Sequence, residues 1–274
     1  MTLSARELID LVLDEGSWSS WDSPPDLAGI GPEYAETLAR AKEKAGTDES
    51  VLTGEGTLQG RRVAVVASEF AFLAGSIGRA AGDRLVAAVE RATAERIPLL
   101  AAPRSGGTRM QEGTPAFVQM IRIAAALAEH KTSGLPYLVY VRHPTTGGVM
   151  ASWGSLGHIT VAEPGALVGF LGPRVYEALY GEAFPEGVQT AENLFAHGIV
   201  DAVVPPEEIG DVLARALRIL IPAGTEPVAS PEEEEIPDDY GDELDPALRA
   251  AVRDPEEMAI ELLTSQLGAR RLDP

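Results

Sequence analysis

Residues 97–130 read IPLLAAPRSGGTRMQEGTPAFVQMIRIAAALAEH, a short aliphatic run, a glycine-rich turn and a long helical pattern in direct succession. The aliphatic run at residues 97–102 predicts a buried strand. Residues 114–130 predict a helix, with Thr114 as its N-cap and Pro115 at the first helical position, where proline is tolerated. A strand, a turn and a helix in this order form the repeating unit of an α/β fold.

The alternation of predicted strands and helices continues on both sides of this unit. Strands are predicted at residues 62–67 and 137–141, and a helix capped by the Gly82–Asp83 pair is predicted over residues 83–95. Later strand candidates are residues 159–162, 166–169 and 200–203. Because crossovers of this length join parallel strands, we expect a largely parallel sheet with helices on its faces.

Composition divides the chain into three expected zones. Residues 1–50 are expected to form an N-terminal helical segment packed on the core, with helices at residues 5–14 and 32–45. Residues 51–221 form the apolar body. Residues 222–274 are expected to form an acidic linker and a C-terminal helix, since the linker is rich in Pro and Glu and should not pack on its own.

Charge and residue usage exclude several classes of function. The 274 residues carry a formal net charge of −20, which disfavours nucleic acid and anionic membranes as partners. No apolar run approaches the roughly 20 residues of a membrane span, and the acidic opening does not resemble a secretory signal, so we expect a cytoplasmic protein. The chain has no cysteine and only four scattered histidines. Disulfides, thiolate zinc sites and a catalytic thiol are therefore excluded, and no metal site is expected.

Two glycine pairs carry the candidate chemistry. Gly106–Gly107 follows the strand at residues 97–102, and Gly147–Gly148 follows the strand at residues 137–141. The carboxyl ends of neighbouring parallel strands meet at one edge of a sheet, so both pairs are expected there. One backbone N–H from each pair could donate a hydrogen bond to the same ligand oxygen, and the two would then form an oxyanion hole. A tight structural turn is the alternative interpretation of each pair.

A third glycine-containing stretch, EFAFLAGSIG at residues 69–78, precedes the helix predicted at 83–95. As a phosphate loop it is weak, because it has neither the GxGxxG order nor a P-loop lysine. Gly75 and Gly78 could let the chain bend beside a ligand, and a buried structural turn explains them equally well.

Side-chain catalysis finds little support in the sequence. No GxSxG elbow surrounds any serine, so a triad of Ser105, His143 and Asp201 is disfavoured. Glu112 and Glu163 could act as an acid and base pair, but capping explains them equally. A site rich in backbone donors and poor in acids and bases suits stabilisation of a thioester enolate, with the other substrate taking the proton.

Five segments together carry a family resemblance. They are DEGSW, VLTGEGTLQGRRVAVVASEFAFLAGSIG, SGGTRMQEG, GLPYLVYVRHPTTGGVMASWGSLGHITVAEPGALVGFLGPRV and QTAENLFAHGIVDAVV, spread over about residues 5–215. Through them the chain resembles the β subunit of the acetyl-CoA carboxylase carboxyltransferase, a biotin-dependent acyl-CoA carboxyltransferase family in the crotonase-like superfamily. The resemblance implies an α/β fold with a crotonase-like ββα spiral.

The resemblance also implies an activity and its site. The carboxyl group would pass from carboxybiotin, held on a separate carrier protein, to an acyl-CoA, giving malonyl-CoA from acetyl-CoA for fatty acid biosynthesis. Backbone amides of the Gly106–Gly107 and Gly147–Gly148 pairs would form the oxyanion hole, with Gly107 and Gly148 the foremost donors. The residues implied on the CoA side of the cleft are Phe72, Gly75, Ser76, Gly78 and Arg109.

Partners follow from the same resemblance. The chain corresponds to the CoA-binding half of the family's active site, so it implies an alpha-type carboxyltransferase subunit, a biotin carboxyl carrier protein and a biotin carboxylase. Two departures stand out: the chain lacks the cysteine-ligated zinc ribbon of many bacterial β subunits, and Thr108 replaces the usual alanine. The alternatives are a biotin-independent malonyl-thioester decarboxylase subunit and a non-catalytic scaffold or regulatory subunit.

Overall fold

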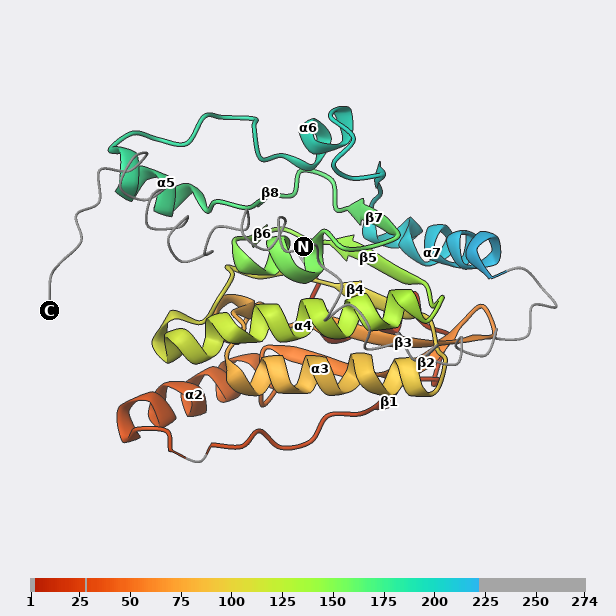
Figure 1. Cartoon of the computed structure of the whole chain (residues 1–274), viewed down its shortest axis with the longest axis horizontal. Coiled ribbons are helices and arrows are strands. Elements are labelled where there is room, and N and C mark those ends of the chain that lie inside the picture. The colour runs from red at the N-terminus through yellow and green to blue at the C-terminus, as the bar shows by residue number, and fades with distance from the viewer. Residues whose placement is uncertain (1–2, 28, 222–274) are drawn as a thin grey trace, which may run out of the picture. The chain divides into compact units, whose positions relative to one another are not determined.

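Three adjacent strands bury side chains on both of their faces, and this double burial organises the fold. The computed structural model describes residues 3–27 and 29–221 (Figure 1). The three strands are β3 (Arg61–Ser68), β4 (Leu99–Ala102) and β5 (Tyr137–Val141). They pair in parallel, with Val65 opposite Leu100 and Leu100 opposite Leu138. Strands buried on both faces are typical of parallel sheets covered by helices.

The sheet continues on both sides of these strands in the order β1-β2-β3-β4-β5-β7-β9. On one side, β2 (Val51–Leu58) and the short β1 (Ser19–Ser20) are antiparallel to their neighbours. On the other side, β7 (Ile159–Ala162) and β9 (Ala202–Val203) extend the parallel part. The prediction of a largely parallel sheet is therefore confirmed.

Alternate residues of the central strands point into two separate cores. Ala64, Leu99 and Val139 face the core under α3 (Arg79–Ala94) and α4 (Thr114–Thr132). Their chain neighbours Val65, Leu100 and Leu138 face the core under α1 (Ala5–Val12) and α7 (Pro206–Leu220). This follows from the two-residue repeat of a strand. Figure 1 shows α3 and α4 lying side by side across one face of the sheet.

Smaller elements complete the described chain. They are α2 (Pro32–Ala45), a parallel pair of β6 (Thr145–Thr146) and β8 (Val168–Gly169), α5 (Pro173–Tyr180), α6 (Ala191–Ala196), a π-helical turn (Met150–Gly154) and 3₁₀ turns at Leu73–Gly75 and Met110–Glu112. Among the helices of residues 3–27 and 29–221, none is long and apolar enough to cross a bilayer. The linker and helix expected within residues 222–274 lie outside the described residues.

Two helices begin at other residues than predicted. The helix predicted at residues 83–95 begins at Arg79, with Gly78 rather than Asp83 at its N-cap, because the Glu112 carboxylate accepts the Arg79 N–H at 2.5 Å. In α4 the N-cap is Gly113, and Thr114 is already helical. In both cases the helix starts earlier than its local sequence indicates.

Candidate active site

The two glycine pairs lie side by side at the carboxyl ends of β4 and β5. A parallel bridge joins the segments that carry them: the Ser105 N–H donates to the Pro144 carbonyl at 2.8 Å, and the Thr146 N–H donates to the Ser105 carbonyl at 3.0 Å. A Cβ atom built on Gly107 would lie 3.8 Å from the Gly148 nitrogen. The juxtaposition expected from the parallel sheet is therefore present.

The glycines are needed for different reasons. Gly107 has φ +110° and Gly147 has φ +64°, conformations that side chains of L-residues rarely adopt. Gly148 has no such φ, but a Cβ there would lie 2.8 Å from the Thr108 hydroxyl oxygen and 3.3 Å from Met120 Cγ. Two residues thus need glycine for backbone conformation, and Gly148 needs it for close packing.

Three of the four amides already have protein acceptors. The Gly106 N–H donates to the Ala74 carbonyl at 2.9 Å, and the Gly147 N–H donates to the Gly169 carbonyl at 3.0 Å. The Gly107 N–H donates to the Ser105 hydroxyl at 3.0 Å. The Gly107 N–H is thus bonded to a side-chain hydroxyl, whereas the Gly106 and Gly147 N–H groups are bonded to backbone carbonyls.

The Gly148 amide is different. Gly148 opens a helical turn that continues into the π-helical turn Met150–Gly154, and N–H groups of a first turn have no acceptor within the helix. Within residues 3–27 and 29–221 its N–H has no other acceptor either. A free N–H directed from a rigid turn is the donor that an oxyanion hole requires.

The stretch at residues 69–78 forms the wall beside the first glycine pair. Leu73, Ala74 and Gly75 all have positive φ, at 44°, 56° and 64°, so the chain makes a tight left-handed turn. A Cβ on Gly75 would lie 2.1 Å from the Arg104 carbonyl oxygen. Glycine is therefore required where this turn touches the loop after β4, and Ala74 then reaches the Gly106 amide.

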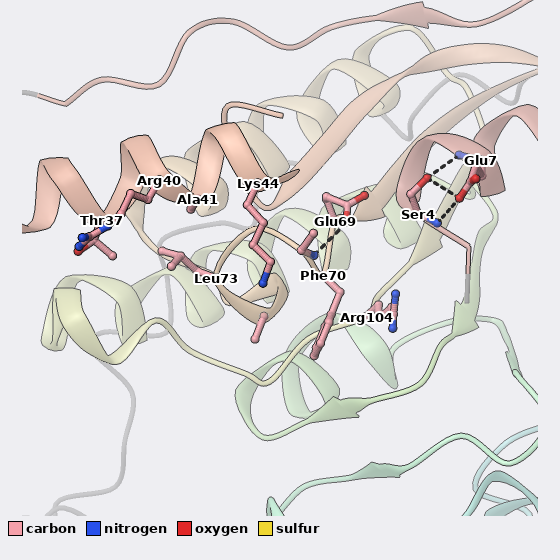
Figure 2. A pocket seen from close by; sticks show the side chains of 12 residues that line it. Ser4, Glu7, Thr37, Arg40, Ala41, Lys44, Glu69, Phe70, Leu73 and Arg104 are labelled. Atoms are coloured by element: carbon pink, nitrogen blue, oxygen red, sulfur yellow. Dashed lines mark hydrogen bonds between the residues drawn. The ribbon is translucent and has the colours of Figure 1, made fainter. Parts of the chain in front are cut away.

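A cavity of about 640 Å³ opens on the other side of this turn (Figure 2). Its lining comes from α1 and the residue before it, from α2, from the 69–74 turn and from the loop after β4. The lining residues are Ser4, Glu7, Thr37, Arg40, Ala41, Lys44, Glu69, Phe70, Ala71, Leu73, Ala74 and Arg104. The volume lies in the range of pockets that hold whole ligands.

Three cations line this cavity: Arg40, Lys44 and Arg104. Figure 2 shows Lys44 extending from α2 toward the turn that carries Leu73. The Arg104 guanidinium stacks over the Phe70 ring at 4.6 Å from its centroid, and its Nε donates to the His143 carbonyl at 2.6 Å. Burial lowers the pKa of Arg104, although the group remains a cation at neutral pH.

The two carboxylates of the cavity are occupied by backbone groups. Glu69 accepts the N–H groups of Ala5 and Ala71, both at 2.9 Å. Glu7 belongs to the capping box of α1 with Ser4, and its hydrogen bonds with Ser4 lower the pKa of Glu7. Their charges therefore serve the fold, and the cations retain donors for an anionic ligand.

Arg109 and Phe72, which were implied on the CoA side of the cleft, are buried in the framework. The Arg109 side chain is fully buried, and its guanidinium donates to Glu49 Oε2 at 3.0 Å, Ser50 Oγ at 3.1 Å and the Ser76 carbonyl at 2.7 Å. Phe72 is 1% exposed and packs with the side chains of α2. Both side chains thus have partners within the protein framework, and their place on the CoA side of the cleft stays a prediction.

The three remaining residues of that set have mainly structural contacts. Gly75 touches the loop after β4, as described above, and the Ser76 hydroxyl donates to the Leu73 carbonyl at 2.7 Å. A Cβ on Gly78 would lie 2.2 Å from a Glu112 carboxylate oxygen. None of the three lines the 640 Å³ cavity, whose wall is formed by their neighbours in the same stretch.

The side-chain alternatives are not assembled. His143 Nδ1 accepts the Leu167 N–H at 3.0 Å, and Asp201 accepts the Thr160 N–H at 2.7 Å. Both are thus bonded to backbone groups, and the buried Ser105 hydroxyl bonds to Gly107 instead.

Glu112 and Glu163, the possible acid and base pair, are likewise bonded to other groups of the protein. Glu112 accepts the Tyr34 hydroxyl at 2.6 Å and caps α3, and Glu163 accepts the His143 N–H at 2.8 Å. Burial, and then this bond to Glu112, raise the pKa of Tyr34. Within the described part of the chain, no group of three or more His, Asp or Glu residues could hold a metal ion.

Sequence reasoning missed the cationic lining of the cavity. Arg40 and Lys44 are one helical turn apart on α2, a spacing that also fits an ordinary solvent-exposed face. Arg104 directly precedes the serine of the SGG motif, and only its position next to a glycine turn sets it apart. No local pattern indicates that these three side chains surround one cavity.

The family model described as the carboxyl transferase domain matches residues 2–258. A curated protein from Mycobacterium tuberculosis (strain ATCC 25618 / H37Rv), named a probable biotin-dependent acyl-coenzyme A carboxylase beta3 subunit, is 64% identical over 230 residues, which are 84% of this chain and 46% of that protein. The chain thus spans about half the length of the first curated relatives it matches.

A second relative is covered more fully. The acetyl-coenzyme A carboxylase carboxyl transferase subunit beta of Rhizobium leguminosarum bv. trifolii (strain WSM1325) is 43% identical over 225 residues, which are 80% of this chain and 75% of that protein.

Solved structures share the fold. A Pseudomonas malonate decarboxylase hetero-tetramer in complex with malonate gives a TM-score of 0.68 at 23% identity, covering 84% of this chain and 87% of that one. The beta subunit of P. aeruginosa geranyl-CoA carboxylase gives 0.64 at 23% identity, covering 81% of this chain and 39% of that one. These similarities confirm the predicted α/β, crotonase-like fold class.

Proposed function

Because this chain belongs to the carboxyl transferase domain family, we propose that it is the acyl-CoA-binding, β-type subunit of a biotin-dependent acyl-CoA carboxylase. The reaction moves a carboxyl group from carboxybiotin to the α-carbon of an acyl-CoA. With acetyl-CoA the product is malonyl-CoA, the building block of fatty acid biosynthesis. Carboxybiotin, on a separate carrier protein, supplies the carboxyl group, and the residues of this chain hold and polarise the thioester.

The observation that carries this proposal is the placement of Gly107 beside Gly148, whose N–H has no acceptor within the described chain. When the α-carbon loses its proton, negative charge develops on the thioester oxygen. An oxygen that gains charge is a stronger acceptor than a hydroxyl, so it would take the Gly107 N–H from Ser105. Two fixed N–H donors in a gap that excludes side chains then stabilise the enolate.

The neighbouring cavity fits the rest of the acyl-CoA. Coenzyme A is a phosphate-bearing nucleotide, and Arg40, Lys44 and Arg104 supply cationic donors for phosphate. Ala74 joins the two regions, because it lines the cavity while its carbonyl accepts the Gly106 N–H at 2.9 Å. Ala74 therefore borders both the cavity and the first glycine pair.

An apolar strip on α4 supports a subunit partner. Phe117, Val118 and Ile121 are 51%, 43% and 73% exposed, and Met110 just before the helix is 70% exposed. Large contiguous apolar surface is uncommon on monomeric proteins and marks contact sites. We assign this strip to the alpha-type carboxyltransferase subunit, and the biotin carboxyl carrier protein and biotin carboxylase complete the proposed complex.

The test is purification of the tagged chain from its native host together with whatever subunits accompany it. We expect ATP- and bicarbonate-dependent carboxylation of acetyl-CoA or propionyl-CoA, and we expect avidin to abolish it. The chain purified alone is then given malonyl-CoA. Release of CO2 without biotin would favour the decarboxylase alternative and overturn the carboxylase proposal.

A further inference from the structure

Thr108 brings a hydroxyl to the edge of the gap between the two glycine pairs. Its backbone is fixed by a parallel bridge to Ile77: the Ile77 N–H donates to the Gly107 carbonyl at 3.0 Å, and the Arg109 N–H donates to the Ile77 carbonyl at 2.9 Å. The Thr108 hydroxyl oxygen lies 2.8 Å from the point where a Cβ on Gly148 would stand. The space freed by the missing Gly148 side chain is thus next to this hydroxyl.

The Thr108 hydroxyl has no partner in the described part of the chain. Neighbouring hydroxyls are bonded to backbone: that of Ser152 donates to the Gly148 carbonyl at 2.6 Å, and that of Thr145 donates to the Pro103 carbonyl at 2.9 Å. Within residues 3–27 and 29–221 the Thr108 hydroxyl forms no hydrogen bond. It is also not one of the fully buried side-chain polar atoms that lack a partner in these residues. It is open to a ligand.

The hydroxyl and the Gly148 amide are close enough to share one acceptor. From bond lengths and angles, a Cβ lies about 2.5 Å from the nitrogen of its own residue, so the two donor atoms are at most about 5.3 Å apart. An oxygen can accept from two donors at hydrogen-bonding distance of each, which spans about this separation. The Thr108 side chain is also β-branched, so its rotamer is restricted and the hydroxyl is preorganised.

We propose that Thr108 is a further catalytic residue, whose hydroxyl donates a third hydrogen bond to the thioester oxygen as the enolate forms. This inference rests on the proposed carboxyl transfer. Thr108 keeps its proton throughout, and no bond to it forms or breaks. Its contribution is confined to the state in which the oxygen carries charge, because a hydrogen bond to a charged acceptor is stronger than one to a neutral carbonyl.

The test compares Thr108→Val, which keeps the shape and removes the hydroxyl, with Thr108→Ser, which keeps the hydroxyl and removes the methyl group. Each variant is purified as the complex from its native host and assayed with acetyl-CoA and propionyl-CoA. We expect Thr108→Val to lower kcat about tenfold, with KM for the acyl-CoA changed less than about twofold. Thr108→Ser should regain most of the lost rate.

Thr132→Val is the matched control, since Thr132 is an exposed threonine at the end of α4. Equal melting temperatures of the wild-type and Thr108→Val complexes would exclude a folding defect. If Thr108→Val does not fold, Thr108→Ala supplies the same loss of the hydroxyl.

Each outcome decides the proposal. A wild-type complex that is active, with Thr108→Val within twofold of its kcat, overturns the role of the hydroxyl alone. The same holds if Thr108→Ser is as slow as Thr108→Val, because the methyl group would then matter. A wild-type complex without carboxyl transfer removes the proposed function, and this inference falls with it.

Discussion

Gly107 and Gly148 face each other across a gap in which a Cβ on Gly107 would stand 3.8 Å from the Gly148 nitrogen. The gap exists because neither residue carries a side chain, and β4 and β5 hold its two sides in register. The two glycines offer no side-chain acid or base that a substitution could remove. They are tested by substitutions that introduce a side chain into the gap.

Gly107→Ala adds a single methyl group to the gap. The new Cβ would lie 3.3 Å from the Thr146 carbonyl oxygen, and alanine would be strained at φ +110°. The Gly107 N–H remains, but the methyl group would stand in the gap that the thioester oxygen must enter. Blocking access to one oxyanion donor should lower kcat of the purified complex by about 10²- to 10³-fold. Strain should lower the free energy of unfolding by about 1–3 kcal/mol.

Gly134→Ala separates these two effects. Gly134 also has a positive φ, at +73°, but open space surrounds its Cβ position. This variant should show a comparable loss of stability and retain its turnover. Full turnover of a folded Gly107→Ala complex would remove Gly107 from the oxyanion hole.

Much of the fold could be predicted, because local pattern and burial agree there. The aliphatic runs of β4 and β5 are buried on both faces, as predicted for parallel strands. The strand β2 was not predicted, since Gly54 and Gly56 interrupt its pattern like turn residues. A Cβ on Gly54 would lie 2.6 Å from the Trp18 ring, so this glycine serves packing with a segment far away in sequence.

The sequence predicted which turns form the candidate site, but not which of their N–H groups are free. Two diglycine turns after adjacent parallel strands predict their meeting, but not which amides are free. That depends on distant acceptors, the carbonyls of Ala74 and Gly169. Arg109 illustrates the same limit, because its partner Glu49 lies 60 residues away and only the folded chain reveals the ion pair.

Lys44→Ala tests whether the 640 Å³ cavity holds the phosphates of coenzyme A. Lys44 lines the cavity from α2, and neither glycine pair is part of that lining. Loss of one cationic contact to phosphate should raise KM for acetyl-CoA about tenfold and change kcat less than twofold. Lys42→Ala is the matched control, because Lys42 is an exposed lysine of the same helix that does not line the cavity. Equal KM values for both variants would place the phosphates elsewhere.

Arg109→Met tests the framework behind the first glycine pair. The substitution replaces the guanidinium by an apolar side chain of similar length. It leaves the Glu49 carboxylate, which is 3% exposed, without its cation. Breaking a buried ion pair should lower the free energy of unfolding by about 3–5 kcal/mol, measured by urea denaturation of the purified chain. Arg122→Met breaks an exposed pair with Asp83 and should lower it by less than about 1 kcal/mol. Similar losses in both variants would contradict the structural role given to Arg109.

The buried His130 should make the free energy of unfolding sensitive to acid. It is fully buried in α4, with Thr93 Oγ1 at 2.9 Å from Nδ1, and burial lowers its pKa to about 4 from an ordinary value of 6.5. Below pH 6.5 the unfolded chain binds a proton at this histidine, whereas the folded chain does not until about pH 4. Protonation therefore favours the unfolded state, and the free energy of unfolding should fall as pH decreases through this window.

His130→Gln removes this proton uptake, so the stability difference between wild type and variant isolates it from the carboxylates that titrate in both. That difference should shift by on the order of 3 kcal/mol between pH 7 and pH 4, to the disadvantage of the wild type. Ile123→Val, a non-titrating change on the same buried face of α4, should give a difference that does not vary with pH. Denaturation curves for the three proteins at both pH values measure these shifts. If the His130→Gln difference is as flat as that of Ile123→Val, His130 does not enter the folded state as a neutral, buried base.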